Sequence, residues 1–167
     1  MSTTKEDLGA AFAGESQANR KYLFFAEKAD GEGHKRVARL FRAVAEAETV
    51  HARNHLKVMQ GVGSTKDNLR EAIGGEHHEF TEMYPAFIKQ AEVESNSKAK
   101  GSFDFANKIE RLHHGLYIDA LDMLEKGQAT ELKPFYVCQY CGNTVEGQAP
   151  EKCPVCGMPK SMFKLIE

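Results

Sequence analysis

The sequence predicts an all-α four-helix bundle followed by a small metal-bound module with a β-ribbon. Two observations indicate the bundle. Long amphipathic stretches fill most of the chain, and a Glu-x-x-His motif occurs in two of them, at Glu48/His51 and Glu110/His113. Residues three apart share one face of a helix, so each motif directs a carboxylate and an imidazole toward one point. All four cysteines form two Cys-x-x-Cys pairs near the C-terminus, which indicates a second metal site.

Length and composition narrow the class of protein. The chain has 167 residues, enough for one ordinary domain and a small module, with 41% apolar and 28% charged residues, as in soluble globular proteins. A formal net charge of -2 without a basic block argues against a nucleic-acid partner. No apolar run is long enough for a membrane span, and residues 1–11 lack the apolar core of a secretory signal. Paired cysteines fit metal binding in a reducing compartment, so we expect a cytoplasmic protein.

The first two helices are predicted from amphipathic stretches in which a few polar residues interrupt the apolar face. The first is expected to begin within residues 3–7, with threonine at the cap and acids in the first turn, and to stop at residues 31–33. Glu15 and Asn19 interrupt its apolar face. The second ends at residues 61–63, and its stripe is interrupted by Glu48, His51 and His55. An ordinary amphipathic helix would have leucine or alanine at such positions.

The remaining helices are less regular. A short helix is expected from residues 64–67 to about Ile73, and Gly74-Gly75 should open or kink the third helix. Pro85 lies inside that helix, so we expect a bend near Tyr84. Residues 94–101 are polar and predict a turn, and the fourth helix should end near Gly127.

An internal repeat joins these helices into two equivalent hairpins. Glu15 matches Glu76 at an offset of 61 residues, and the Glu-x-x-His motifs match at an offset of 62. Such a pattern, with one Glu from each of two helices and Glu-x-x-His from each of the other two, is typical of di-iron or di-manganese carboxylate bundles. The alternative is a set of solvated surface pairs. Repeated carboxylates in register with apolar residues favour the metal site, because an uncompensated buried carboxylate costs several kcal/mol.

The C-terminal module is predicted to depend on metal for its fold. Residues 128–133 are a polar linker and residues 134–167 are too few to fold without a metal, a disulfide or a partner. The four thiolates suit tetrahedral zinc or a single iron, and a purely structural zinc ribbon is the alternative to a redox site. Tyr140 and the Phe135-Tyr136 pair are expected in the core of this module. The predicted ligands are Cys138, Cys141, Cys153 and Cys156.

These motifs, taken in order, resemble the rubrerythrin family over essentially the whole chain. The resemblance rests on the sequence of residues 13–18, on both Glu-x-x-His motifs, on Glu76-x-x-Glu79 followed by residues 82–85, and on the C-terminal knuckle pair. It implies a ferritin-like bundle over residues 1–127 with a non-haem di-iron centre. It also implies a rubredoxin-like domain over residues 134–167 with one iron, where zinc also fits.

The resemblance further implies a role for each ligand. Glu48 and Glu110 resemble the carboxylates that bridge the two irons. The terminal ligands are then Glu15 and His51 for one iron, and Glu76 and His113 for the other.

Three more residues complete the site that the resemblance implies. Glu79 matches a glutamate that can exchange with the histidine at the His51 position when the redox state changes. Tyr22 and Tyr84 match tyrosines that line the pocket, although from the residues alone such a tyrosine is more often a core residue with a hydrogen-bonded hydroxyl.

The implied activity is reduction of hydrogen peroxide to water in protection against oxidative stress. Electrons would come from rubredoxin or an NAD(P)H-dependent reductase through the cysteine-bound iron. The alternatives are a ferroxidase or iron-handling protein, and a non-enzymatic electron carrier or redox sensor. We expect a homodimer or larger assembly in which helices could be swapped. The linker alone offers little to hold the module on its own bundle, and the resemblance favours a head-to-tail dimer, so we expect electron transfer between subunits.

Overall fold

The computed structural model describes residues 2–128 and 132–166, so residues 129–131 of the expected linker lie outside the described residues. The chain divides into two compact units, residues 1–63 and 64–167, and each is described by itself. No helix in the described part is long and apolar enough to cross a membrane. The elements are α1 (Thr4–Gly31), α2 (Lys35–Val58), α3 (Thr65–His78), a π-helical turn η1 (Glu79–Met83), α4 (Tyr84–Val93), α5 (Ser97–Glu125), β1 (Phe135–Cys138), β2 (Thr144–Glu146), a 3-10 turn η2 (Lys160–Met162) and β3 (Phe163–Ile166).

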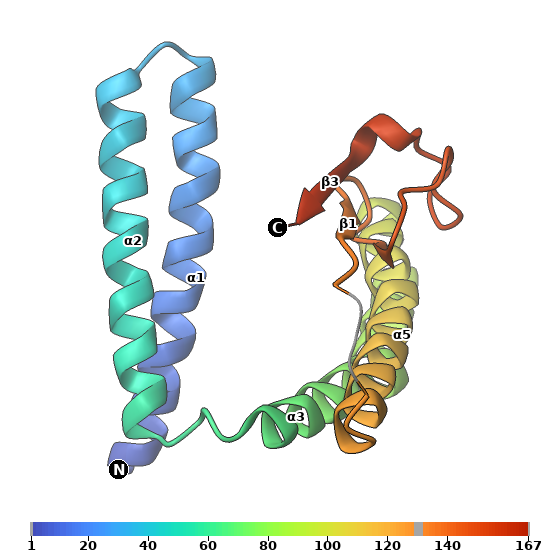
Figure 1. Cartoon of the computed structure of the whole chain (residues 1–167). Helices are drawn as coiled ribbons and strands as arrows, with labels where there is room; N and C mark the ends of the chain where they lie inside the picture. The colour runs from blue at the N-terminus through green and yellow to red at the C-terminus, as the bar shows by residue number, and fades with distance from the viewer. Residues whose placement is uncertain (1, 129–131, 167) are drawn as a thin grey trace. The chain divides into compact units, whose positions relative to one another are not determined.

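The first unit is a hairpin of two long helices, α1 and α2 (Figure 1). Thr3 caps α1, and its hydroxyl accepts from the Glu6 amide while the Glu6 carboxylate accepts from the Thr3 amide, a reciprocal capping box. The expected threonine cap and the end of the helix at Gly31 are therefore confirmed. Gly33 adopts φ +82° in the connection, a conformation that favours glycine.

Small side chains form the contact between α1 and α2. The buried hydrophobic residues of the hairpin are all alanines: Ala26, Ala29, Ala38, Ala45 and Ala52. Their size lets the two helices approach closely, but it buries little apolar surface. Within this unit the larger side chains Phe24 and Leu40 stay 58% and 62% exposed.

A π-helical turn divides the long helical segment at the start of the second unit. α3 continues through Gly74-Gly75 to His78, so the prediction that these glycines open or kink a helix was wrong. The irregularity lies at η1, where the Tyr84 amide donates to the Glu79 carbonyl five residues back. Pro85 has no N–H to donate, which favours a change of helical register just before it. The bend expected near Tyr84 therefore takes the form of this π turn.

The last helix begins earlier than expected. α5 starts at Ser97, with the Asn96 side chain accepting from the Ala99 amide, so the predicted polar turn over residues 94–101 is confined to its first three residues. Ser95 at φ +54° makes that turn.

The cysteine module, residues 134–167, contains a three-stranded antiparallel sheet in the order β2-β1-β3. Its register pairs Val137 with Thr144 of β2 and with Lys164 of β3. The module packs on α5: the Tyr140 ring meets the Phe105 ring edge-on at 5.7 Å between centroids. Tyr140 is 54% exposed, so the expectation that it lies in the core of the module was wrong.

Candidate metal centres

The hairpin of the first unit brings together one of the two predicted carboxylate–histidine sets. Glu15 of α1 faces Glu48 and His51 of α2, and one ligand atom from each lies within 4.8 Å of the others. The Nδ1 atom of His51 is 2.9 Å from Glu48 Oε2 and 3.8 Å from Glu15 Oε1. The i, i+3 spacing of the motif thus produces the convergence expected of it.

The second unit repeats this arrangement with Glu76 of α3 and the motif on α5. Ligand atoms of Glu76, Glu110 and His113 also lie within 4.8 Å of one another. The Nδ1 atom of His113 is 2.8 Å from Glu110 Oε2 and 3.8 Å from Glu76 Oε2. The two sets, here called the first and second triad, are geometrically equivalent.

The second triad has the electrostatics of a cation site. Burial raises the pKa of Glu76, and the neighbouring carboxylate of Glu110 raises it further. Its Oε2 atom is buried and has no hydrogen-bond partner in the described residues. An orphaned carboxylate oxygen beside a second carboxylate and an imidazole nitrogen is the donor set that iron and manganese accept. The residues present therefore fit a metal ion.

Glu79 lies one helical turn beyond Glu76, at the start of the π turn. It is half-buried, and it is not among the three residues whose ligand atoms converge in the second triad. Burial raises the pKa of its carboxyl group, and the charge of Glu76 adds to that shift. Glu79 thus lies close enough to the triad to sense its charge, and π turns recur at functional sites.

The two candidate tyrosines occupy equivalent places in the aromatic clusters of the two units. Burial raises the pKa of Tyr84, and the charges of Glu110, Glu79 and Glu76 raise it further, so its hydroxyl lies near these carboxylates. Tyr22 is half-buried, and its ring packs against Phe25 and Phe41 at centroid distances of 6.2 and 6.0 Å.

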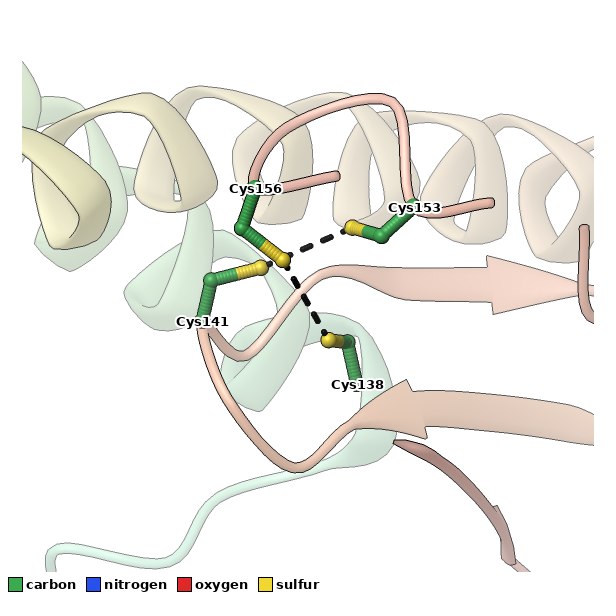
Figure 2. Close-up of side chains that lie close together, drawn as sticks. All are labelled: Cys138, Cys141, Cys153 and Cys156. Atoms are coloured by element: carbon green, nitrogen blue, oxygen red, sulfur yellow. Dashed lines mark hydrogen bonds between the residues drawn. The ribbon is translucent and has the colours of Figure 1, made fainter. Parts of the chain in front are cut away.

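The four cysteines converge on one point of the module (Figure 2). The sulfur atoms of Cys138 and Cys156, and those of Cys141 and Cys153, are each 3.7 Å apart, and all four lie within 4.8 Å of one another. Gly142 and Gly157, one residue after each pair, take φ +82° and +78° and turn the chain around the sulfurs. This is the close arrangement that a tetrahedral metal requires.

The thiols themselves also favour a metal. Burial acts to raise the pKa of Cys153, but hydrogen bonds from the backbone amides of Cys156 and Val155, together with contacts to the Cys156 and Cys141 sulfurs, lower that pKa to about 7. Burial raises the pKa of the Cys141 thiol well above its usual range. A bound cation removes this conflict by holding all four as thiolates, and iron or zinc meets the requirement.

Two polar residues of these sites were not predicted from the sequence in their actual roles. The Asn19 amide donates to the Ala45 carbonyl at 2.7 Å and to the Thr49 hydroxyl at 2.8 Å, which ties α1 to α2 beside the first triad. Its place on an apolar face was noticed, but the partners could not be known. Thr144 lies 3.0 Å from Nε2 of His113, and no sequence pattern links the two residues.

Comparison with known proteins places these sites in a family. The sequence model of the rubrerythrin family matches residues 6–121, and that of the rubrerythrin rubredoxin-like domain matches residues 136–164. Rubrerythrin-2 of Clostridium acetobutylicum is 34% identical, over 96% of this chain and 95% of its own length. Nigerythrin of Nitratidesulfovibrio vulgaris is 36% identical, over 98% of this chain and 86% of its own.

Solved structures agree with the sequence comparison. The structure of fully reduced, all-ferrous nigerythrin aligns with a TM-score of 0.60 at 34% identity, covering 99% of this chain and 88% of that one. The predicted fold class, all-α and ferritin-like with a small cysteine-bearing β domain, is confirmed, as is the pairing of carboxylate–histidine sites with a four-cysteine site. The chain belongs to the rubrerythrin family of di-iron redox proteins.

Proposed function

We propose that this protein is a non-haem di-iron peroxidase that reduces hydrogen peroxide to two waters, consuming two electrons and two protons. The observation that supports this proposal most directly is the presence of two equivalent triads and a four-cysteine site in one chain. Two metal ions suit a two-electron reduction, and the cysteine site provides an inlet for electrons. An iron-storage protein needs no such inlet, which favours the peroxidase over iron handling.

In this proposal the triads hold the two irons, and each residue has the role that the family resemblance implies. Glu15, Glu48 and His51 would hold iron at the first triad, and Glu76, Glu110 and His113 would hold it at the second, with Glu48 and Glu110 in the role that the resemblance assigns to them. The irons, when bound, supply the two electrons that cleave the O–O bond. The polypeptide orients them and delivers protons.

Proton delivery is assigned to Glu79 and Tyr84. Because the pKa of Glu79 is raised by burial and by Glu76, its carboxyl group holds a proton nearer to neutral pH than an ordinary glutamate does. Tyr84 keeps its phenolic proton, because its pKa is also raised, and can donate a hydrogen bond toward the carboxylates. Glu79 also has the chemistry to replace His51 as a ligand of the oxidised centre. Tyr22 of α1 is the equivalent residue of the first unit and is proposed to line the metal pocket there.

The proposed cellular setting follows from the same sites. Rubredoxin or an NAD(P)H-dependent reductase would supply electrons to an iron held by Cys138, Cys141, Cys153 and Cys156. We propose a homodimer or larger assembly that acts in the cytoplasm against oxidative stress.

A single-turnover comparison tests the function. The iron-loaded protein, purified anaerobically, should consume peroxide continuously when given a reductase and NAD(P)H. The Cys138→Ser variant should lose this continuous turnover, yet after chemical reduction it should still consume one equivalent of peroxide per di-iron centre. Glu151→Gln, an exposed change in the same module, is the matched control and should behave as wild type. Continuous turnover by Cys138→Ser, or no peroxide consumption by the reduced wild type, would refute the proposal.

A further inference from the structure

We propose that Thr144 is the positioning residue through which the cysteine module orients His113 of its own chain. This inference rests on the proposed role of His113 as an iron ligand and extends it. It assigns to a residue of the module a direct part in building the metal centre on α5.

The hydrogen bonds around Thr144 determine which atom donates. Its hydroxyl has a single hydrogen, and Oγ1 lies 3.1 Å from the Gly142 carbonyl oxygen, which can only accept. Oγ1 therefore accepts from Nε2–H of His113, at 3.0 Å. With Nε2–H donated to Thr144, Nδ1 is the ring nitrogen that can bind a metal ion. It faces Glu110 Oε2 at 2.8 Å, and a bound cation would take the place of the proton between these two atoms. Partners of this kind fix the ring orientation of metal-bound histidines.

The module is held in place for this contact by two further residues of α5. Phe105 packs against the Tyr140 ring, and a Cβ added at Gly142 would meet Ile109 at 3.7 Å. Phe105, Ile109 and His113 are successive residues four apart, so they form one stripe on a helix. The module therefore contacts three consecutive turns of α5. The linker is therefore not the module's only connection to its own helices.

The same contacts connect the two metal sites by a short path. Gly142 is bonded directly to Cys141, its carbonyl accepts from Thr144, and Thr144 accepts from His113. Two hydrogen bonds thus separate a cysteine ligand from an imidazole ligand. His51 differs: Nδ1 contacts Glu48 and Glu15, its side chain is 53% exposed, and no described residue of its own unit bonds Nε2.

The first experiment observes the Nε2–H proton itself. In the reduced, iron-loaded full chain, histidine ligands give paramagnetically shifted, solvent-exchangeable N–H signals in proton NMR, and His51→Gln identifies which one belongs to His51. The His113 signal should exchange with solvent about tenfold more slowly than the His51 signal, as one hydrogen bond predicts. Thr144→Val should abolish that protection, and Thr144→Ser, which keeps the hydroxyl, should retain it.

The second experiment follows electron transfer in the same variants. After rapid reduction of the cysteine-bound iron, its reoxidation by the di-iron centre should be about tenfold slower in Thr144→Val and near wild type in Thr144→Ser. The visible spectrum and reduction potential of the cysteine-bound iron report whether the module is intact, and both should be unchanged.

The outcomes separate this inference from the proposed function. Absence of any His113 signal in the wild type would overturn both. A His113 signal whose exchange is the same in wild type and Thr144→Val would overturn the role of Thr144 and leave the peroxidase proposal standing. Failure of Thr144→Ser to restore protection would show that packing, and not the hydroxyl, matters, which also overturns the inference.

Discussion

The two halves of the helical region carry the same site in different surroundings. Each unit holds the same aromatic cluster, with ring-centroid distances of 6.2, 6.0 and 5.5 Å in the first unit and 6.2, 6.3 and 5.5 Å in the second. The clusters are Tyr22, Phe25 and Phe41, and Tyr84, Phe87 and Phe103, each pair of equivalents 62 residues apart. Equivalent side chains therefore recur in three dimensions as well as in sequence.

One inserted residue interrupts the internal repeat, and the structure shows its location. Glu15 and Glu76 are 61 residues apart while the tyrosines are 62 apart, so the second unit has one extra residue between glutamate and tyrosine. The π turn over Glu79–Met83 absorbs it, because a π turn holds one residue more than an α turn. The same segment carries Glu79, the acid that the first unit lacks. The helices of the two units are thus duplicates that differ by one inserted residue.

The second difference is how far other residues enclose the histidine of each triad. The side chain of His113 is 26% exposed and bonded on both ring nitrogens, whereas that of His51 is 53% exposed and, among the described residues of its own unit, bonded on Nδ1 alone. The cysteine module supplies the second hydrogen bond of His113, since Thr144 belongs to it. The experiments below test each source of asymmetry, beginning with the largest expected effect.

Unfolding the cysteine module should remove the hydrogen bond that distinguishes His113 from His51. Cys153→Ser leaves three sulfur ligands, and metal binding supplies about 10 kcal/mol or more of the folding free energy in such modules. We expect residues 134–167 to lose their dispersed NMR signals, while far-UV circular dichroism shows the helices retained. The control is Lys152→Gln, an exposed neighbour. A dispersed spectrum from the metal-free module would contradict this.

Removing the extra acid should make the halves chemically alike. Glu79→Ala should fold and bind two irons but lose peroxide turnover by about 100-fold, the scale of one general acid. Steady-state turnover and iron content are the measurements. Glu82→Ala is the matched control, because Glu82 lies in the same π turn but is 71% exposed and pairs with His78. If Glu79→Ala and Glu82→Ala turn over equally fast, Glu79 has no special role.

A substitution of Asn19 would remove an interhelical contact that, among the described residues, only the first unit has. Its amide bonds two groups of α2, whereas Thr81, 62 residues later, bonds the His77 carbonyl in its own helical segment. Asn19→Ala should lower the free energy of unfolding by about 1–3 kcal/mol, because buried partners lose their bonds. Urea unfolding measures this, with Ser16→Ala, on the exposed side of α1, as control. A loss no larger than the control's would mean that the interhelical bonds contribute nothing.

The smallest expected effect concerns pH. The folded-state pKa of Glu76 is raised, so its stabilising contribution is present at acidic pH and is lost as pH rises through that pKa. Metal-free Glu76→Gln should therefore be more stable than metal-free wild type at neutral pH, by about 1 kcal/mol, and the gain should vanish in acid. Denaturant unfolding at both pH values checks this, with Glu71→Gln, an exposed residue of the same helix, as control. A gain that persists in acid would assign the effect to something other than charge.

Features encoded by short sequence patterns could be predicted, whereas features set by contacts between distant residues could not. The Thr3 cap, the two Glu-x-x-His motifs and the cysteine pairs are short patterns, and each gave its expected geometry. Gly74-Gly75 was misjudged because tertiary contacts along α3 override the weak helix propensity of glycine. The π turn was visible only as the mismatch between offsets of 61 and 62.

The contact between His113 and Thr144 was beyond sequence reasoning for a different reason. It joins residues 31 positions apart through the docking of one element on another. Tyr140 was misjudged in the same way, because an aromatic residue in a small module is usually core, and here it meets α5 instead.

The alanine contact between α1 and α2 has a consequence for synthesis in the cell. Residues 1–63 leave the ribosome first, and the remaining chain takes roughly 5–20 s at typical elongation rates. During that interval the nascent hairpin fully buries no apolar side chain larger than alanine and presents Phe24 and Leu40 to the solvent. Packing supplies most of the stability of helices in proteins, so this hairpin gains less of it than a helix pair with large buried side chains. Until translation is complete, the N-terminal third of this protein therefore exposes apolar surface, the feature of nascent chains that chaperones counter.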